Sequence, residues 1–496
     1  MRCKRVCLVV NPRAGYNITH ITDILAIFAA AGWKTDIALK TYGGEVMKLA
    51  AEAAEQGHDR VIAYGGDGTL NKVVNGVMLA KKQSAFAALP GGTANEWATE
   101  ISLPLDPVHA ALSIVNSDAR TIDLGHVEVQ RLMFPDAQGE DDQRLPKSKK
   151  TYKKGTKGSS KAKHRFLLMA GLGIDAQILP YISKSLKYQI GRRAFEAAAA
   201  RRLPELRSFP AEIYAINDAG DESLLWRGTA WQLLIANTRL YGSMVDVAPE
   251  AYLDDGKLDV CVITTGDLFA TIGQITSLLL RHRPDETTVQ YFQGAHFAIR
   301  VPASVGMHLD GSFVKLRDYL SKSDREALRQ ADNADQVMVE YRFDVEPHTL
   351  QVAIPRTYDN ALFEKSIGKE QPYTVSQQQA NAVTTQQYVH FLTLDTRELP
   401  ERVNKLWEHG RRVTLVGVAP NPERRDTYII AGTVQSQKTG DIAPVAVCID
   451  DATVILTLAG ESVPPATLQG LPEGKVIGVE GKKNKLGVIQ ATHVVF

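Results

Sequence analysis

Over residues 5 to 103, short apolar runs alternate with segments whose apolar residues recur every three or four positions. The first pattern is typical of buried strands and the second of amphipathic helices. The strand-like runs are RVCLVV, KTDIAL, RVIAY and AFAAL. The helical segments carry Ile18, Ile21, Ile24, Leu25 and Phe28, then cover about 44 to 57, then follow Thr69. This alternation predicts a parallel sheet with helices on its faces and ligands at the carboxyl ends of its strands.

From about 122 to 311 the pattern changes to short strand-like runs, which predict an antiparallel, β-rich second domain. The runs include FLLMAG, AEIYAI, WQLLIAN, KLDVCVI and HFAIRV. A helix is expected around 181 to 206, with its apolar residues either facing the core or lining the entrance to a site. A polar insert follows at 316 to 336, and FDVEPHTLQVAIP is expected to return as a strand pair that closes the first two domains.

The remaining chain divides into a linker and a third unit. Six glutamines within residues 366 to 387 predict a flexible linker. Short β-runs then continue to the end, after a helix expected at 396 to 409, and they fit a small β-barrel of the OB type. The expected organisation of the 496 residues is an α/β domain at 1–122 that is closed by 343–363, a β-rich domain at 123–342, a linker at 364–387, and an accessory barrel at 388–496.

Charge changes this picture only locally, because the formal net charge is +1. Residues 144–165 carry ten Lys or Arg and no acid, so the segment from 135 to 165 is expected to be a disordered insert that can contact an anionic membrane surface. The four cysteines are expected to be free thiols in a reducing compartment. No apolar run reaches the roughly 18 residues of a membrane span, so a cytoplasmic protein, peripheral on the membrane, is expected.

The stretch AYGGDGTLNKVVNGV places three glycines and one carboxylate between a strand and a helix. Backbone N–H groups at such a helix N-terminus bind phosphate. Asp67 would repel phosphate unless it holds a metal ion or accepts a proton, and the alternative is a helix N-cap formed by Asp67 or Thr69. The turns at 11–15 and 91–96 end neighbouring strands, so all three turns are expected to line one cleft. The turn lacks the spacing of a P-loop or a dinucleotide fingerprint.

Five motifs in order carry a resemblance to a known family: VVNPRAG, AYGGDGTLNKVVNGV, LPGGTANEWATEI, AGLGIDAQI and APEAYLDDGKLDV. Over about residues 1 to 363, apart from the inserts, the chain resembles the diacylglycerol kinase catalytic domain in its bacterial lipid-kinase form. The resemblance implies an ATP-dependent lipid kinase with a nucleotide domain, a β-sandwich domain and a cleft between them. The implied substrate is a lipid alcohol, and diacylglycerol is the expected one.

The resemblance also implies functional residues. Thr93 would offer a hydroxyl to the nucleotide, and Asn95 and Glu96 would shape the turn around it. The implied ATP contacts are Asn11, Thr41, Gly65, Gly66, Asp67, Gly68, Thr69, Leu70, Asn71, Gly92, Thr93 and Asn95. A structural Mg²⁺ would be held by Asp255 and by the positions of Tyr252 and Lys257, and oxygen ligation suits that ion. A plain β-turn before a strand is the alternative for this segment.

One position departs from the family pattern. Where bacterial lipid kinases carry a glutamate as the proposed base, this chain reads MHLDGSF, with Ser312 in that place. A serine hydroxyl does not accept a proton at neutral pH, so the role is expected to move to Asp67, with Asp310 as the nearer carboxylate in sequence.

Several alternatives stay open at this stage. They are a catalytically weak relative that binds nucleotide and lipid at a membrane surface, an NAD kinase, and an adaptor function of the C-terminal barrel. Nucleic-acid binding by the barrel is disfavoured, because its strands lack a series of stacking aromatic residues. A homodimer is also left open.

Overall fold

Alternating apolar runs at the N-terminus form the predicted parallel sheet in a computed structural model of the chain. The structure describes residues 4–12, 20–41, 44–134, 163–174, 176, 207–242, 245–264, 289–331, 335–364, 400–421, 427–435, 442–484 and 488–496. The strands are β1 (Arg5–Val10), β2 (Lys34–Leu39), β3 (Arg60–Gly65) and β4 (Ala85–Pro90), in the spatial order β2-β1-β3-β4. Strands β3 and β4 are buried along their whole length, as expected of a parallel sheet covered on both faces.

Helices connect these strands as the periodicity predicts. They are α1 (Ile21–Ala30), α2 (Glu45–Glu55), α3 (Asp67–Val77), α4 (Glu96–Glu100) and α5 (Pro107–Val115). Helix α3 begins at Asp67 itself, three residues earlier than the pattern indicates, and it buries Leu70, Val73, Val74 and Val77.

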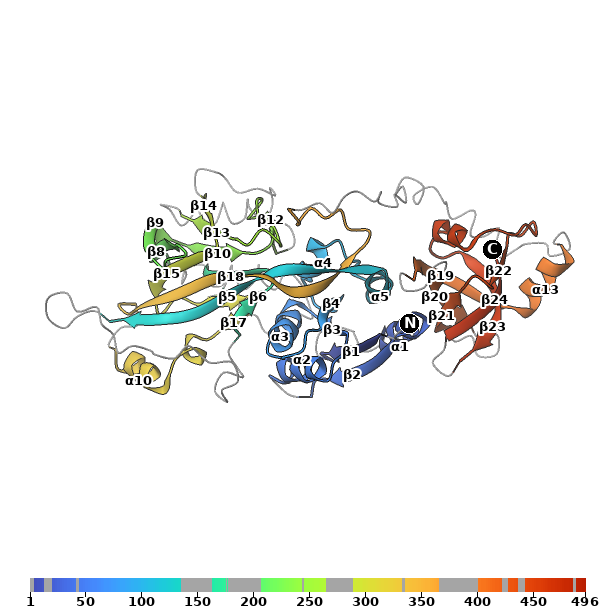
Figure 1. The fold of residues 1–496 in the computed structure, drawn as a ribbon, viewed down its shortest axis with the longest axis horizontal. Helices are drawn as coiled ribbons and strands as arrows, with labels where there is room; N and C mark the ends of the chain where they lie inside the picture. The colour runs from blue at the N-terminus through green and yellow to red at the C-terminus, as the bar shows by residue number, and fades with distance from the viewer. Residues whose placement is uncertain are drawn as a thin grey trace.

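Two long antiparallel strands, β5 (Ser117–Met133) and β18 (Met338–Pro355), run through both the first and the second domain, and Figure 1 shows them as two long arrows side by side. Strand β18 also pairs in parallel with β4, through Val352 and Phe86. The sheet is therefore continuous from the first domain into the second. The expected boundaries at 122 and 342 fall inside these two strands, which both domains share.

The second domain is an antiparallel sandwich, as predicted. One layer continues from β18 through β15 (His296–Pro302), β8 (Phe209–Ile216) and β9 (Glu222–Ala230), and β6 (Arg165–Phe166) joins it on β5. The other layer consists of β14 (Val289–Gly294), β13 (Leu258–Ile263), β10 (Gln232–Ala236), β7 (Met169–Gly173), β16 (Met307–Leu309) and β17 (Ser312–Val314). Apolar side chains from both layers share one core.

Shorter elements complete this domain. Strands β11 (Leu240–Tyr241) and β12 (Val245–Asp246) pair beside α4. The polar insert at 316–336 contains a 3₁₀ turn, η4 (Leu316–Asp318), and a helix, α10 (Lys322–Gln330), that begins with a capping box between Ser321 and Asp324. The helix expected around 181 to 206 lies outside the described residues. No described helix has the length and apolar character needed to cross a membrane.

The C-terminal unit is a closed barrel. Helix α13 (Glu401–His409) precedes β19 (Arg411–Pro420), β20 (Tyr428–Gln435), β21 (Ile442–Ile449), β22 (Val454–Leu456), η6 (Pro465–Gly470), β23 (Val476–Lys483) and β24 (Val488–Val495). Five strands form the ring β21-β20-β19-β23-β24, which a parallel pairing of β21 with β24 closes. The predicted small barrel is confirmed.

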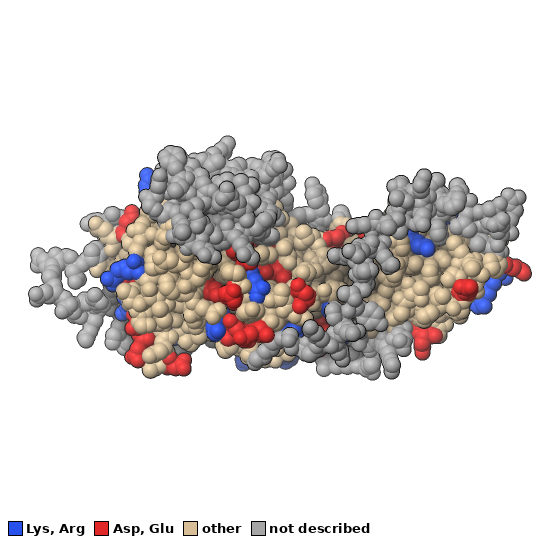
Figure 2. Space-filling model, turned by 90° about the horizontal axis from the view of Figure 1, so that it is seen from above, with Lys and Arg blue, Asp and Glu red and all other residues tan. Residues whose placement is uncertain are grey.

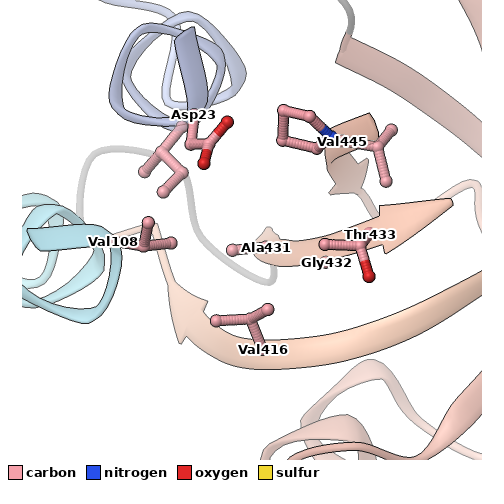
Figure 3. A pocket seen from close by; sticks show the side chains of 9 residues that line it. Asp23, Val108, Val416, Ala431, Gly432, Thr433 and Val445 are labelled. Carbon is pink, nitrogen blue, oxygen red and sulfur yellow. The ribbon is translucent and has the colours of Figure 1, made fainter. Parts of the chain in front are cut away.

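The barrel packs directly on the first domain, an arrangement the sequence did not indicate. Helix α1 contacts β20 and β21, and Ile27 shares one buried cluster with Ala431 and Ala446. On α5, His109 Nε2 hydrogen-bonds the Val416 carbonyl at 2.8 Å. Figure 3 shows the small pocket between them, with Asp23 and Val108 facing the barrel strands. Among the described cysteines, Cys7, Cys261 and Cys448 are buried free thiols, as predicted.

Candidate active site

Two glycine turns touch at the carboxyl ends of β3 and β4. A Cβ placed on Gly66 would lie 2.9 Å from the Gly92 Cα, and one placed on Gly92 would lie 2.4 Å from the Gly66 Cα. Only glycine at both positions allows this approach. Gly66 is the N-cap of α3, so the turn presents the backbone N–H groups of the helix N-terminus beside the second turn. The predicted convergence is confirmed for these two turns.

The first turn is tied to the same place through Asn11. Its backbone N–H donates to the Tyr64 carbonyl at 3.1 Å, and its side-chain amide donates to Thr69 Oγ1 at 2.9 Å. Lys40 Nζ donates to Asn11 Oδ1 at 3.3 Å. Residues 13–15 of this turn lie outside the described residues. Asn11 therefore braces the glycine turn and brings a lysine close to it.

The other predicted nucleotide contacts differ in their exposure and in the hydrogen bonds that they already make. Thr93 is exposed at the second turn, so its hydroxyl is accessible to a ligand. Asn95 adopts a left-handed conformation (φ 52°) and accepts a hydrogen bond from the Gly92 N–H at 2.8 Å, which shapes the turn. Thr41 is engaged locally, because its N–H and hydroxyl donate to Glu45 at 2.7 and 2.9 Å. Leu70 is buried in the core.

Asp67 is the first residue of α3 and makes no N-cap hydrogen bond, so the reading of Asp67 as a simple N-cap is wrong. Its Oδ1 accepts a long hydrogen bond, 3.3 Å, from the backbone N–H of Trp97 on α4. Burial raises the pKa of Asp67, and the negative charge of Asp310 raises it further. A carboxylate with a raised pKa beside a phosphate-binding turn is a stronger proton acceptor than an exposed one.

Asp310 has a different environment. It is 3% exposed and accepts hydrogen bonds from three backbone N–H groups, of Leu167, Leu168 and Met169, at 2.9 to 3.1 Å. The Asn71 amide donates a fourth at 2.8 Å. A carboxylate offers about four lone-pair positions, and each oxygen of Asp310 already has two donors. Asp310 thus fixes the β16–β17 turn. The Asn71 side chain, on α3, bonds to Asp310, so its amide is already used within the protein.

Ser312 follows that turn and reaches the glycine loop. A Cβ placed on Gly68 would lie 2.5 Å from Ser312 Oγ, so the serine hydroxyl sits directly against Gly68. The turn residues Asp310 and Gly311 both have positive φ, as a tight two-residue hairpin requires. The hairpin therefore places Ser312 directly beside the glycine turn.

The end of the basic insert also belongs to the site, which corrects its expected boundary at 165. Arg165 is part of β6 and forms an ion pair with Glu346, and the backbone carbonyl of Arg165 accepts from Asn71 at 2.9 Å. Burial lowers the pKa of Lys163 to about 7, and the charge of Lys72 lowers it further, while Asp310 opposes both. The sequence predicted that Lys163 belongs to a solvated loop. A run of basic residues gives no indication of which one is buried against the rest of the protein.

The predicted metal segment lies in the second domain, between β12 and β13. Asp255 Oδ1 accepts from the Lys257 N–H at 3.0 Å, and the Tyr252 ring lies 4.8 Å from the Arg239 guanidinium. Asp123 on β5 accepts from the Gly256 N–H at 2.7 Å and is fully buried. Burial raises the pKa of Asp255, and the charge of Asp123 adds to this effect.

Two neighbouring carboxylates and the carbonyls of a tight turn are oxygen donors of the kind that Mg²⁺ prefers, so this segment fits the ion. Asp123 was missed at the sequence level. Its signal was a lone acid inside the apolar run TIDLGHV.

Comparisons with known proteins agree with this arrangement. Residues 5–127 match the diacylglycerol kinase catalytic domain, and residues 169–353 match the YegS C-terminal NAD kinase beta sandwich-like domain. A diacylglycerol kinase of Bacillus subtilis is 26% identical over 313 residues, 62% of this chain and 90% of the relative. A probable YegS-like lipid kinase of Pseudomonas savastanoi is 28% identical over 279 residues, 56% of this chain and 77% of the relative.

Among solved structures, a putative diacylglycerol kinase from Bacillus anthracis is 18% identical, with a TM-score of 0.49, covering 72% of this chain and 98% of the other.

Proposed function

Because the chain belongs to the diacylglycerol kinase catalytic-domain family, we propose that it transfers the γ-phosphoryl group of ATP to the hydroxyl of a lipid alcohol, with diacylglycerol as the acceptor. The contact between Gly66 and Gly92 carries this proposal. It joins two glycine turns at one helix N-terminus, with an accessible threonine hydroxyl on one side and the Asp67 carboxylate on the other. An NAD kinase is less favoured, because LPGGTANEWA and DDGKLD match the lipid-kinase motifs.

Asp67 is the proposed proton acceptor for the lipid hydroxyl. Its raised pKa suits that role, and it is the first residue of α3, whereas Asp310 is held by four donors in the β16–β17 turn. Phosphoryl transfer passes through a loose transition state, so correct placement of the reactants and positive charge contribute most of the rate. Lys72 on α3 is the proposed source of that charge, whereas Lys163, whose pKa is lowered to about 7, is only partly charged at neutral pH. A bound Mg²⁺, held by Tyr252, Asp255 and Lys257, would stabilise the acidic segment of the second domain.

The C-terminal barrel is proposed to have the OB topology and to act as a regulatory module. In its ring, the third strand (β21) pairs in parallel with the fifth (β24), and the first (β19) pairs with the fourth (β23), which matches an OB barrel. OB barrels bind ligands on the face of their second and third strands, and here β20 and β21 contact α1. Nucleic acid is therefore disfavoured on that face.

Membrane contact through residues 144–165 and a homodimer remain predictions. Most of the basic segment lies outside the described residues. On the face drawn in Figure 2, the visible acidic side chains gather near the middle of the molecule, and the basic ones are scattered. An anionic membrane would therefore have to be attracted by the segment itself rather than by the described part of this face.

The test is phosphate transfer from radiolabelled ATP to a panel of lipid alcohols in mixed micelles, with NAD as a separate acceptor. The expected result is a labelled phospholipid, with diacylglycerol as the best acceptor. Asp67→Asn, which keeps the shape of the turn, should reduce kcat by at least about a hundredfold, the usual contribution of a general base. Labelled NADP, or no labelled product with any lipid, would refute the proposal. Near-normal kcat in Asp67→Asn would refute the role of that residue.

A further inference from the structure

Two histidines and a glutamate meet at the base of the insert, outside the cleft described above. His126 and Glu128 lie on the same face of β5, and His164 immediately precedes β6. One potential ligand atom from each residue lies within 4.8 Å of the others. His126 Nε2 is 3.7 Å from Glu128 Oε1, and these two side chains are 16% and 28% exposed. The cluster is thus partly buried and still open to a small ion.

Hydrogen bonds and ring contacts hold the histidines in place. His164 Nδ1 hydrogen-bonds the Val127 carbonyl at 3.2 Å, which makes Nδ1 the protonated nitrogen and leaves the lone pair on Nε2. Histidines that ligate metals usually donate their other ring N–H in this way. The His126 and His164 rings stack with centroids 5.8 Å apart, and the edge of Tyr319 packs on His164.

Neighbouring arginines are engaged with other carboxylates. The Arg165 guanidinium donates to Glu346 at 2.5 and 2.8 Å, and Arg342 Nε donates to Asp344 at 2.9 and 3.0 Å. An imidazole nitrogen and a carboxylate oxygen on one face of a strand are groups that together bind a cation.

We propose that His126, Glu128 and His164 form a binding site for a divalent transition metal ion, with Zn²⁺ as the best fit. Two imidazole nitrogens and one carboxylate are a common three-residue ligand set for Zn²⁺, with water in the fourth position. Bonds of about 2.0 to 2.2 Å would draw the ligand atoms closer together, by up to roughly 1.5 Å for the widest pair. This site is distinct from the segment around Asp255 that fits Mg²⁺.

The position of this site suggests what the ion would stabilise. The His164 N–H donates to Asn75 Oδ1 at 3.2 Å, and Asn75 lies on α3, whose N-terminus forms the glycine turn. A metal bound to β5 and to His164 would fix the end of the basic insert, including Lys163, against this helix. Metal binding is therefore expected to raise the thermal stability of the folded chain.

The test uses the full chain after removal of metals by a chelator. Zn²⁺ titrated by calorimetry should bind one ion per chain with a micromolar or lower Kd, and Co²⁺ in its place should give the visible absorption of a four-coordinate site. Glu128→Gln and His126→Asn should each weaken Zn²⁺ binding by at least about tenfold, since each removes one of three ligands. The matched control is His296→Asn, because His296 lies on β15, bonds Asp344 at 2.7 Å and is outside the cluster.

Circular dichroism in the presence of chelator shows whether each variant is folded, so a loss of binding is assigned to the ligand alone. The proposal is overturned if the wild-type chain binds no Zn²⁺ at micromolar concentration. It is also overturned if Glu128→Gln and His126→Asn bind as tightly as His296→Asn, or if millimolar Mg²⁺ displaces the ion, which would indicate a generic acidic site.

Discussion

Two carboxylates lie close to the glycine turn, and their hydrogen bonds give them different roles. Asp310 uses all its acceptor positions on three backbone N–H groups and one amide, so it fixes the hairpin. Asp67 is the first residue of α3 and interacts with the backbone N–H groups of Glu96 and Trp97. Burial raises the pKa of both carboxyl groups, and we propose that Asp67 is the one available for chemistry because Asp310 is fixed in the hairpin. Ser312 lies against Gly68, at the position where the family carries a glutamate. A substitution at Ser312 therefore tests whether Asp67 is the proton acceptor.

Ser312→Glu should lower kcat/KM by about tenfold, roughly 1.4 kcal/mol of transition-state stabilisation. The new carboxylate would extend over Gly68, where it repels both the phosphates and Asp67. Ser312→Gln has the same size without the charge and serves as the control, with a smaller expected loss. Steady-state kinetics with the best lipid acceptor gives the answer. If Ser312→Glu instead gains tenfold in kcat, the natural chain lacks a base that Asp67 does not replace.

At the scale of elements, helix α4 connects the glycine turn to the second domain through a buried acid. Glu100, 7% exposed, accepts a hydrogen bond from the Leu240 N–H of β11 at 2.6 Å. Burial raises the pKa of Glu100 from 4.5 to about 7. The folded protein therefore favours the protonated form of this side chain, and the contact between α4 and β11 depends on pH.

The sign of this dependence follows from the direction of the shift. The stability that protonation of Glu100 contributes is complete below pH 4.5 and is lost as the pH rises through about 7. Glu100→Gln, which keeps the acceptor oxygen without the charge, should therefore be more stable than wild type at pH 8, by up to about 3 kcal/mol. The two should be similar at pH 4.5.

Urea unfolding at the two pH values measures this difference. Glu55→Gln is the control, because Glu55 is exposed and also accepts a backbone N–H, from Lys81 at 2.6 Å. An equal effect of Glu100→Gln at both pH values would show that the charge of Glu100 is not what the folded state disfavours.

At the scale of the whole molecule, the barrel is docked on the nucleotide domain by alternate residues of its strands. On β20, Ile430 belongs to the interior cluster of the barrel, and its neighbour Ala431 belongs to the cluster that contains Ile27 of α1. Helix α1 is the next described helix after the turn that begins at Asn11, so we expect the position of the barrel to influence the proposed nucleotide site. A regulator that released the barrel would then change nucleotide binding.

Ala431→Arg should therefore separate the barrel from α1, because an arginine does not fit at a position that is 3% exposed. The expected results are a larger radius of gyration in small-angle X-ray scattering and a raised KM for ATP, with the barrel itself still folded. Ile442→Arg on β21 is the matched control, since Ile442 is 69% exposed, and it should leave both quantities unchanged. A wild-type scattering profile for a folded Ala431→Arg chain would contradict this docking.

The sequence by itself determined the features that depend on local patterns. Apolar spacing predicted the order of strands and helices in the first domain, the antiparallel second domain and the small barrel, because side-chain period reflects local backbone geometry. The glycine turns were also readable, since backbone conformation and close approach restrict those positions to glycine. The motifs identified the family and located the cleft without any coordinates.

Only the tertiary structure decided which side chains act and which hold the fold together. Asp310 and Asn71 are 239 positions apart and bond directly, so sequence order gave no sign that Asp310 is fully engaged. Lys163 and His164 looked like parts of a solvated basic loop until they packed beside α3. The packing of Ala431 with Ile27 is likewise a contact between segments that are far apart in the sequence. Such contacts depend on which distant segments of the chain pack together, and local sequence patterns do not contain that information.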